Sequence, residues 1–323
     1  MRVKFVIALS LVLIFGTLGC AGEPAPSVSE TPSASTPATS LRFNLADFPK
    51  LDGSTATIPL CSLLMQRLVG VSETEADAAC VFSTTPTAYR NLSSGYGEGQ
   101  VINEETGNPL PASGPTLLLA YEPDEVTKDQ MTINETELEY HPIGRDGLVF
   151  IANSSNLVSG LTTEEIRAIY TAGITNWKQL GGNDQEIIAF QRPEESGSQA
   201  LFRKLVTGDI ELAKAPTTLV ADSMGSLIDS VASYQNTGNA LGYSVFYYVT
   251  RMLSVPELKI LAVDEVTPSR ETIASGAYPF VNDFYAVIRK DEPAGSPTRQ
   301  LLEWLKSPEG AQLILEAGYV GLG

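Results

Sequence analysis

Four short segments of the chain combine serine and threonine hydroxyls with glycine or proline, the residues of tight turns. Backbone N–H groups at a helix start, together with such hydroxyls, form a set of hydrogen-bond donors that suits an oxyanion. We therefore expect these turns to build an anion-binding site, although each turn alone is equally explained by helix capping, for which serine and threonine are preferred. The four turns are residues 52–59, 83–87, 191–198 and 222–226.

The third turn differs from the others because it contains an arginine. Arg192 stands four residues before Ser196, at the predicted end of a strand. From there its guanidinium can form a bidentate pair with the anion that the turn holds. The alternative is an arginine that is solvated on the surface.

A hydrolase that uses Ser196 or Ser198 as nucleophile is the main alternative from another class of function. No Gly-x-Ser-x-Gly elbow surrounds either serine, and no Ser-x-x-Lys sequence occurs in the chain. His141 is the only imidazole that could act as the base, and it precedes Pro142 in a predicted strand. A structural role for His141 and a binding protein that is not an enzyme are therefore favoured.

The composition restricts which sites the chain can build. Its 323 residues include one histidine and three cysteines, too few for an imidazole cluster or a four-thiolate site, so we expect neither a metal nor a cofactor. Acidic side chains outnumber basic ones by 38 to 21, and the net charge of −17 argues against nucleic acid as a partner. With 43% hydrophobic residues, the chain can bury a core.

The N-terminus is typical of a bacterial lipoprotein. Arg2 and Lys4 precede an apolar run, residues 5–18, that is shorter than the roughly 20 residues a membrane span needs. The pattern predicts a signal peptide over residues 1–19 and lipidation of Cys20, so that the protein is extracytoplasmic and anchored to the cell membrane. A plain secretory peptide or an uncleaved anchor is the alternative.

A linker follows the predicted lipidation site. Residues 20–40 are rich in serine, threonine and proline, and they contain no aromatic side chain. Such a segment cannot bury enough apolar surface to offset the entropy of ordering. We expect a flexible tether there, which would serve an adhesive or structural surface lipoprotein equally well.

Two further cysteines, Cys61 and Cys80, remain in the predicted extracytoplasmic part. In an exported protein two such cysteines favour a disulfide, and closing this short loop would stabilise the fold by roughly 3 kcal/mol. Two buried free thiols are the alternative, because sequence does not give the distance between the residues.

Short strand-like and helical segments alternate from residue 41 onward. The alternation predicts an α/β fold with mainly parallel sheets covered by helices. In such folds, ligands bind at the carboxyl ends of the strands, where the following helices begin. Thr162 and Glu165 have the spacing of a capping box at one predicted helix. The clearest predicted strands are 149–151, 187–190, 241–249 and 280–288, and the clearest predicted helices are 60–69, 161–170, 198–206, 297–305 and 308–316.

The sequence Arg192-x-x-x-Ser196-Gly197-Ser198 resembles the Arg-x-x-x-Ser-Gly-Thr element of the extracytoplasmic phosphate-binding proteins that feed phosphate ABC transporters. The resemblance extends from about Asp52 to the C-terminus. Supporting stretches are residues 160–162, 174–177, 240–243 and 305–310.

This resemblance implies a two-lobed clamshell, similar to periplasmic binding proteins, with the anion dehydrated between the lobes. It implies one lobe from residues 41–143 plus 276–323 and a second from 144–275, joined by crossing segments near 141–153 and 277–289. It also implies inorganic phosphate as ligand, an ABC permease as partner and hinge closure as the signal to the permease. The implied phosphate-binding residues are Thr57, the backbone of Ile58, Thr85, Arg192, Ser196, Gly197 and Ser198.

Glu122 stands where the family has an aspartate that accepts the phosphate proton. The resemblance therefore implies that Glu122 takes this role, but a longer side chain leaves the preference for phosphate over another tetrahedral oxyanion open. The alternative is an ordinary exposed loop acid. A sensor that binds no oxyanion tightly also remains open.

Overall fold

The computed structural model describes residues 41–95, 114–194, 196–215, 219–221, 223–233, 238–253 and 255–322. All of them belong to one compact unit of the chain, Thr39–Gly323. The predicted signal peptide, Cys20 and the tether to residue 40 lie outside the described residues. Within these ranges, no helix has the length and apolar character that crossing a membrane requires.

The described strands form one large sheet and one small one. The order in the large sheet is β1-β2-β9-β3-β6-β5, and β7 pairs with β3 beside this path. β4 and β8 form a separate parallel pair. The strands are β1 Leu51–Gly53, β2 Leu117–Ala120, β3 Leu138–Asn153, β4 Gly160–Leu161, β5 Ile188–Ala189, β6 Ala240–Val245, β7 Leu258–Ile260, β8 Ala262–Val263 and β9 Val281–Arg289.

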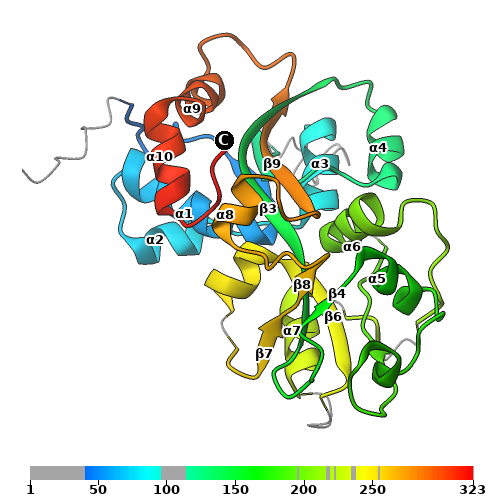
Figure 1. Cartoon of the computed structure of the whole chain (residues 1–323). Coiled ribbons are helices and arrows are strands. Elements are labelled where there is room, and N and C mark those ends of the chain that lie inside the picture. The colour runs from blue at the N-terminus through cyan, green and yellow to red at the C-terminus, as the bar shows by residue number, and fades with distance from the viewer. Residues whose placement is uncertain are drawn as a thin grey trace, which may run out of the picture. The chain divides into compact units, whose positions relative to one another are not determined.

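The 16-residue strand β3 connects the two ends of the large sheet. Its residues up to Gly147 pair with β9, whereas residues from Leu148 onward pair with β6 and then with β7. Figure 1 shows β3 and β9 running next to each other between the two groups of helices. The segments expected to cross between lobes, 141–153 and 277–289, fall on these two strands.

The α/β class is confirmed, but the prediction of mainly parallel sheets is wrong in this detail. In the large sheet only β1–β2 and β5–β6 are parallel. The pairs β2–β9, β3–β9, β3–β6 and β3–β7 are all antiparallel. Each of these antiparallel pairs contains β3, β9 or both, and the alternation of elements along the chain does not reveal the direction of these two strands.

The five helices predicted most clearly from the sequence begin within two residues of observed helices, whereas Glu73–Ala79, Glu125–Thr132 and Arg270–Ala274 lie outside the predicted helices. Thr162 and Glu165 form the expected capping box at α5. The strand predicted over 241–249 ends at Val245, and a π-helix follows from Tyr248 to Met252. The α-helices are α1 Ile58–Leu68, α2 Glu73–Ala79, α3 Thr85–Ser94, α4 Glu125–Thr132, α5 Thr163–Tyr170, α6 Gly197–Phe202, α7 Met224–Ser233, α8 Arg270–Ala274, α9 Pro297–Leu305 and α10 Pro308–Glu316.

Helices cover both faces of the sheet because successive strand residues point to opposite faces. In β2, Leu118 and Ala120 join a core cluster with α3, whereas Leu117 and Leu119 join the main core. In β6, a Cβ at Gly242 would meet side chains of α7, and the next residue, Tyr243, stacks on Phe202 of α6. The ends of the strands are therefore held between helix layers, where the turns meet.

Cys61 and Cys80, for which the sequence left a disulfide and two free thiols open, are joined in a disulfide with a Cα–Cα distance of 6.0 Å. It links α1 to the end of α2, and both residues are buried. Among the described residues, no group of three or more His, Cys, Asp or Glu side chains is arranged to hold a metal ion.

Candidate functional site

A cavity of about 290 Å³, here called the polar pocket, brings together residues from all four hydroxyl-rich turns. Four helical segments start at it: α3, α6, α7 and a short 3-10 helix, η1, over Thr55–Thr57. Of the described residues that line the pocket, none carries a carboxylate. They are Ser54, Thr55, Thr84, Thr85, Tyr121, Arg192, Pro193, Ser196, Gly197, Ser198, Leu201, Ser223, Met224 and Val245.

At the first turn, the backbone passes so close to β2 that only glycine fits. Gly53 has a φ of +150°, and a Cβ there would lie 1.9 Å from the carbonyl oxygen of Leu119. Ser54 then caps η1, because its Oγ accepts a hydrogen bond from the N–H of Ala56 at 3.3 Å. Ser54 and Thr55 thus reach the polar pocket at a helix start, where the first N–H groups have no partner within the helix.

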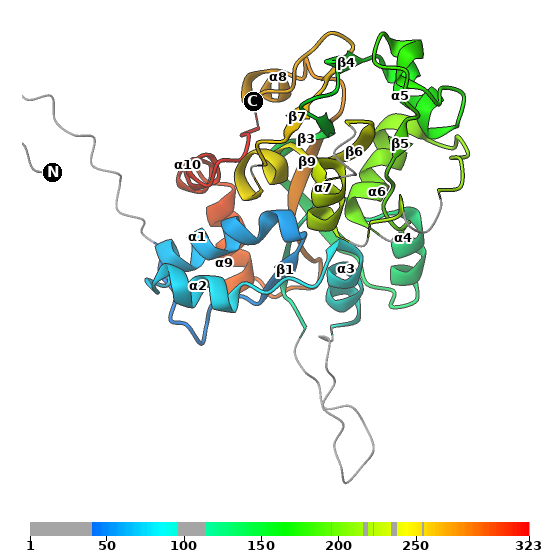
Figure 2. The same cartoon turned by 90° about the horizontal axis from the view of Figure 1, so that it is seen from below.

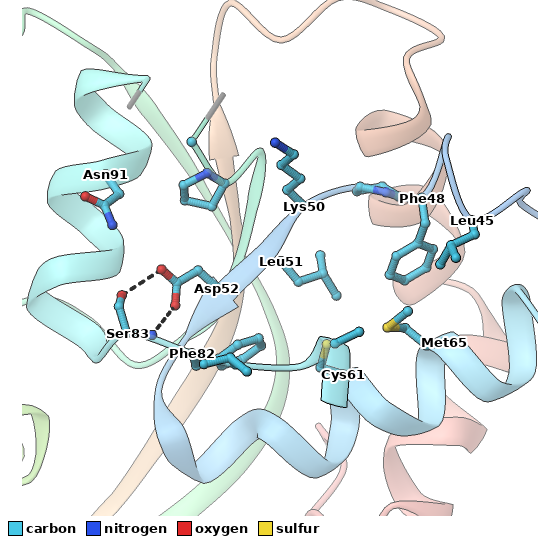
Figure 3. A pocket seen from close by; sticks show the side chains of 15 residues that line it. Leu45, Phe48, Lys50, Leu51, Asp52, Cys61, Met65, Phe82, Ser83 and Asn91 are labelled. Atoms are coloured by element: carbon cyan, nitrogen blue, oxygen red, sulfur yellow. Dashed lines mark hydrogen bonds between the residues drawn. The ribbon is translucent and has the colours of Figure 1, made fainter. Parts of the chain in front are cut away.

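Asp52 holds the second turn against the first. Its carboxylate accepts hydrogen bonds from the N–H of Gly53 (2.7 Å) and from the N–H (2.8 Å) and hydroxyl (2.6 Å) of Ser83. Figure 3 shows both contacts with Ser83. Thr84 precedes α3 without capping it through its side chain. The hydroxyl of Thr85, a residue that is only 4% exposed, has no hydrogen-bond partner among the described residues.

At the third turn, Arg192 is buried and held by its neighbours. Its Nε donates to the carbonyl oxygen of Ala221 (2.7 Å), and its Nη1 donates to Oγ of Ser198 (3.1 Å). Its backbone N–H donates to the hydroxyl of Tyr243 (3.0 Å). Ser196 caps α6 by accepting a hydrogen bond from the N–H three residues later (3.1 Å). The guanidinium is thus fixed at the wall of the polar pocket before a ligand arrives.

The fourth turn adds a further hydroxyl residue, Ser223, to the polar pocket. The second and third turns lie close to each other there. At the start of α7, Oγ of Ser223 and Oγ of Ser226 each accept from the other residue's N–H at 3.0 Å. A Cβ on Gly197 would stand 3.0 Å from Oγ1 of Thr85. In Figure 2, α3 accordingly lies next to α6 and α7. Elements from both ends of the sheet therefore converge on one small volume.

The structure does not place Thr57 and Ile58, two predicted phosphate ligands, at the polar pocket. Thr57 is fully buried, and its hydroxyl donates to the carbonyl oxygens of Ser54 (2.8 Å) and Leu119 (2.6 Å). The N–H of Ile58 donates to the carbonyl oxygen of Thr55. Both groups are used to fold the turn, which presents to the polar pocket the residues two to three positions earlier, and a contact of Thr57 or Ile58 with phosphate stays a prediction.

Glu122 is also absent from the described lining of the polar pocket, and its role as acceptor of the phosphate proton stays a prediction. Its carboxylate accepts from Nζ of Lys204 (2.6 Å) and from the hydroxyl of Tyr285 (2.9 Å). It borders a neighbouring cavity of about 580 Å³ instead. Burial acts to raise the pKa of Glu122, but the hydrogen bonds from Lys204 and Tyr285 leave it below its usual value. The carboxylate is therefore committed to an ion pair between β2 and the segment after α6.

The residue before it, Tyr121, does line the polar pocket and is held from behind by a buried acid. Its hydroxyl donates to Oδ2 of Asp146 at 2.8 Å, while Oδ1 accepts the N–H groups of Gly147 (2.8 Å) and Tyr247 (3.1 Å). Burial raises the pKa of Asp146 to about 6. Asp146 lies in β3 and thereby joins the wall of the pocket to the strand that connects both ends of the sheet.

His141, the one histidine of the chain, lies elsewhere. Its Nε2 is 3.2 Å from Oε2 of Glu139, and it does not line the polar pocket. Ser196 and Ser198 therefore have no imidazole base beside them. The geometry gives the hydrolase alternative no activated nucleophile.

Another hollow of the described surface, about 660 Å³, is not the best candidate site. Figure 3 shows that apolar side chains, among them Leu45, Phe48, Met65 and Phe82, occupy much of its lining. Its carboxylate, Asp52, is already satisfied by the turns described above. It therefore lacks the converging helix starts and the guanidinium that distinguish the polar pocket.

Nine of the described residues that line the polar pocket were not expected individually from the sequence, among them Ser54, Thr55, Thr84 and Tyr121. Capping rules offered a signal for the first, since the residue just before a helix start directs its hydroxyl along the first turn. No local signal distinguishes Tyr121 from Glu122, because which of two adjacent residues faces the pocket depends on the register of β2. Of the predicted ligands, Thr85, Arg192, Ser196, Gly197 and Ser198 are brought together there.

Comparisons with known proteins give a consistent result. A family model described as a PBP superfamily domain matches residues 89–309. The phosphate-binding protein PstS of Bacillus subtilis is 29% identical over 198 residues, which cover 61% of this chain and 62% of that protein. The PstS of Borreliella burgdorferi is 27% identical over 205 residues, which cover 61% of this chain and 70% of its own. The match thus spans less than two thirds of the Bacillus protein.

Two solved structures show the same fold. One, from Clostridium perfringens, is assigned as a phosphate ABC transporter substrate-binding protein and holds bound phosphate. It has a TM-score of 0.61 and 22% sequence identity, and the match covers 85% of this chain and 99% of that one. The other is an ABC-type phosphate transport receptor from Vibrio cholerae, with a TM-score of 0.57, 23% identity and coverage of 84% and 99%. The clamshell fold that the sequence predicts is confirmed at this level.

Proposed function

The chain belongs to the PBP superfamily, and on this premise we propose that it captures inorganic phosphate in the polar pocket. It acts as an extracytoplasmic binding protein, not as an enzyme, and delivers the ion to an ABC permease. The names of its relatives in Bacillus and Borreliella, both phosphate-binding proteins, support this function.

The observation that carries the proposal is the convergence of four helix starts and one buried guanidinium on a pocket without a described carboxylate. Each α-helix start contributes N–H groups and a positive partial charge, which favour an anion. Arg192 adds a full charge in a planar geometry that suits an oxyanion. Because these groups are held by internal hydrogen bonds, they lose little freedom when they replace the water around the ion.

In this proposal Ser54, Thr55 and Thr85 contact the ion from one lobe, and Ser54 and Thr55 take the role that the family resemblance implies for Thr57 and Ile58. The other lobe contributes the groups of the third turn, namely Arg192, Ser196, Gly197 and Ser198. The two lobes comprise residues 41–143 with 276–323, and residues 144–275.

The remaining parts of the proposal concern the N-terminus. Residues 1–19 act as a signal peptide, Cys20 carries the lipid, and residues up to 40 form a tether that keeps the folded part near the membrane and its permease. Radiolabelled fatty acid that appears in the wild-type protein but not in Cys20→Ala would support this anchor.

The test of the function is titration calorimetry with inorganic phosphate. Arg192→Ala should weaken binding by about 3–5 kcal/mol, or roughly a hundredfold to several thousandfold, because the dianion loses its one charged partner among the lining residues. Arg251→Ala, at an exposed arginine outside the pocket, is the matched control and should bind as the wild type does. Equal phosphate affinity in Arg192→Ala and in the wild type would contradict the proposal.

Another tetrahedral oxyanion remains a second candidate, and the position of Glu122 favours keeping it. With that carboxylate committed to Lys204 and Tyr285, no described lining residue accepts a phosphate proton as a carboxylate does. Selection against fully ionised sulfate then depends on size and donor geometry alone. Competition between sulfate and phosphate, measured from pH 5 to pH 9, separates the two candidates.

A further inference from the structure

The polar pocket is larger and less polar than an inorganic anion requires. Its volume of about 290 Å³ equals that of about ten water molecules at roughly 30 Å³ each, whereas phosphate has five heavy atoms. The volume is close to the lower end of the range of about 300–1,000 Å³ found for small-molecule sites. Part of the pocket is therefore left over once the ion is bound.

The space that is left over has an apolar wall. Leu201, Met224 and Val245 line the pocket together with the ring of Tyr121. These groups offer no hydrogen bond to an oxyanion, and a fully ionised ligand gains nothing by displacing water from them. A carbon substituent does gain from that contact, since burying apolar surface is favourable in proportion to its area.

The apolar wall also borders a second cavity. Leu201 lines both the polar pocket and the neighbouring cavity of about 580 Å³. That cavity contains the Glu122–Lys204 ion pair and the partly apolar start of α4. A substituent attached to the anion and directed to this side therefore meets the side chain of Leu201, and the ion pair lies on the cavity beyond it.

The pocket is larger than phosphate needs, has an apolar wall, and is lined at its other end by hydrogen-bond donors. We therefore propose that it also binds small organic phosphorus oxyanions, namely alkylphosphonates and phosphate monoesters. This inference rests on the proposed function, because it uses the same donors for the head group. Three terminal oxygens bind the helix starts and Arg192, and the substituent packs against Leu201, Met224 and Val245.

The experiment is a calorimetric series at pH 8 with inorganic phosphate and with methyl-, ethyl- and propylphosphonate. Each added methylene should raise the affinity about fourfold, which corresponds to ~0.8 kcal/mol per buried CH₂ group. Met224→Ala should flatten this trend. Met252→Ala, the same substitution at another half-buried methionine on the same core, lies outside the pocket and should preserve it.

The outcomes separate the two proposals. If phosphate binds but the phosphonates neither bind nor displace it, or if affinity falls with each methylene, the pocket takes only the inorganic ion and the inference is overturned. If phosphonates bind and phosphate does not, the inference stands and the proposed function is wrong. If neither binds, both are overturned. If the gain in affinity per methylene group is the same in the wild type and in Met224→Ala, the proposed contact between Met224 and the substituent is contradicted.

Discussion

A pair of threonine-to-valine variants distinguishes the residues that bind the ion from those that fold the turn. Valine has nearly the volume of threonine, so each change removes a hydroxyl and little else. In Thr85→Val the lost hydroxyl has no partner among the described residues, so the ligand is its natural acceptor. A hydrogen bond to a charged group contributes about 1.5–3 kcal/mol, so phosphate affinity should fall about tenfold to a hundredfold.

Thr57→Val should have the opposite effect. Its hydroxyl has one hydrogen, which two carbonyl oxygens share, and both oxygens also accept a backbone N–H. Neither carbonyl is left unpaired by the change, so the loss is that of one ordinary hydrogen bond, about 1 kcal/mol. For a chain of this size we expect a melting temperature lower by about 2–4 °C and nearly unchanged phosphate affinity.

Titration calorimetry and thermal unfolding without ligand measure the two quantities separately. Thr85→Val should change affinity with an unaltered melting temperature, and Thr57→Val should change the melting temperature. The reasoning is refuted if Thr57→Val loses affinity at full stability while Thr85→Val binds normally, because the ion would then lie deeper in the first turn than the polar pocket.

Three further predictions concern groups around the pocket. Burial raises the pKa of Asp146 from 3.8 to about 6, so its contribution to stability is full well below pH 3.8 and is lost as the pH rises through 6. Relative to Asp146→Asn, the wild type should lose roughly 2 kcal/mol of unfolding free energy between pH 4 and pH 7 in denaturant titrations. Glu122→Gln should change phosphate affinity less than about fivefold by calorimetry, since a partly exposed pair with Lys204 is worth about 0–1 kcal/mol. Replacing Cys61 and Cys80 by serine opens a loop with a sequence separation of 19 and should lower the free energy of unfolding by about 3 kcal/mol in urea titrations.

The sequence predicts those parts of the fold that local rules determine. Helices α9 and α10 begin and end where proline at the first position and the apolar pattern indicate. The direction in which strands pair is a different matter, because it depends on where residues far apart in the chain meet. Asp146 of β3 and Asn282 of β9 are paired in the sheet, although 136 positions (282 − 146) separate them in the sequence. No local sequence pattern predicts that pairing.

The same distinction explains the outcome at the site. The third turn can be predicted from its local sequence, because an arginine and a capping serine stand at a fixed spacing in it. Arg192 and Ser196 are indeed found together in the pocket. The first turn cannot be predicted in this way, since Ser54, Thr55 and Thr57 are chemically alike. Which hydroxyl faces outward is decided by the close contact of Gly53 with β2, which turns Thr57 toward Leu119.

The acidic character of the chain and its proposed anionic ligand are compatible because the two act over different distances. The net charge of −17 is spread over the chain, and salt screens interactions between exposed charges beyond about 10 Å. Inside the pocket, Arg192 is the only charged side chain among the described lining residues, and the helix starts add partial positive charges that screening affects little. The overall charge therefore governs how fast an anion approaches, whereas these fixed donors govern how long it stays.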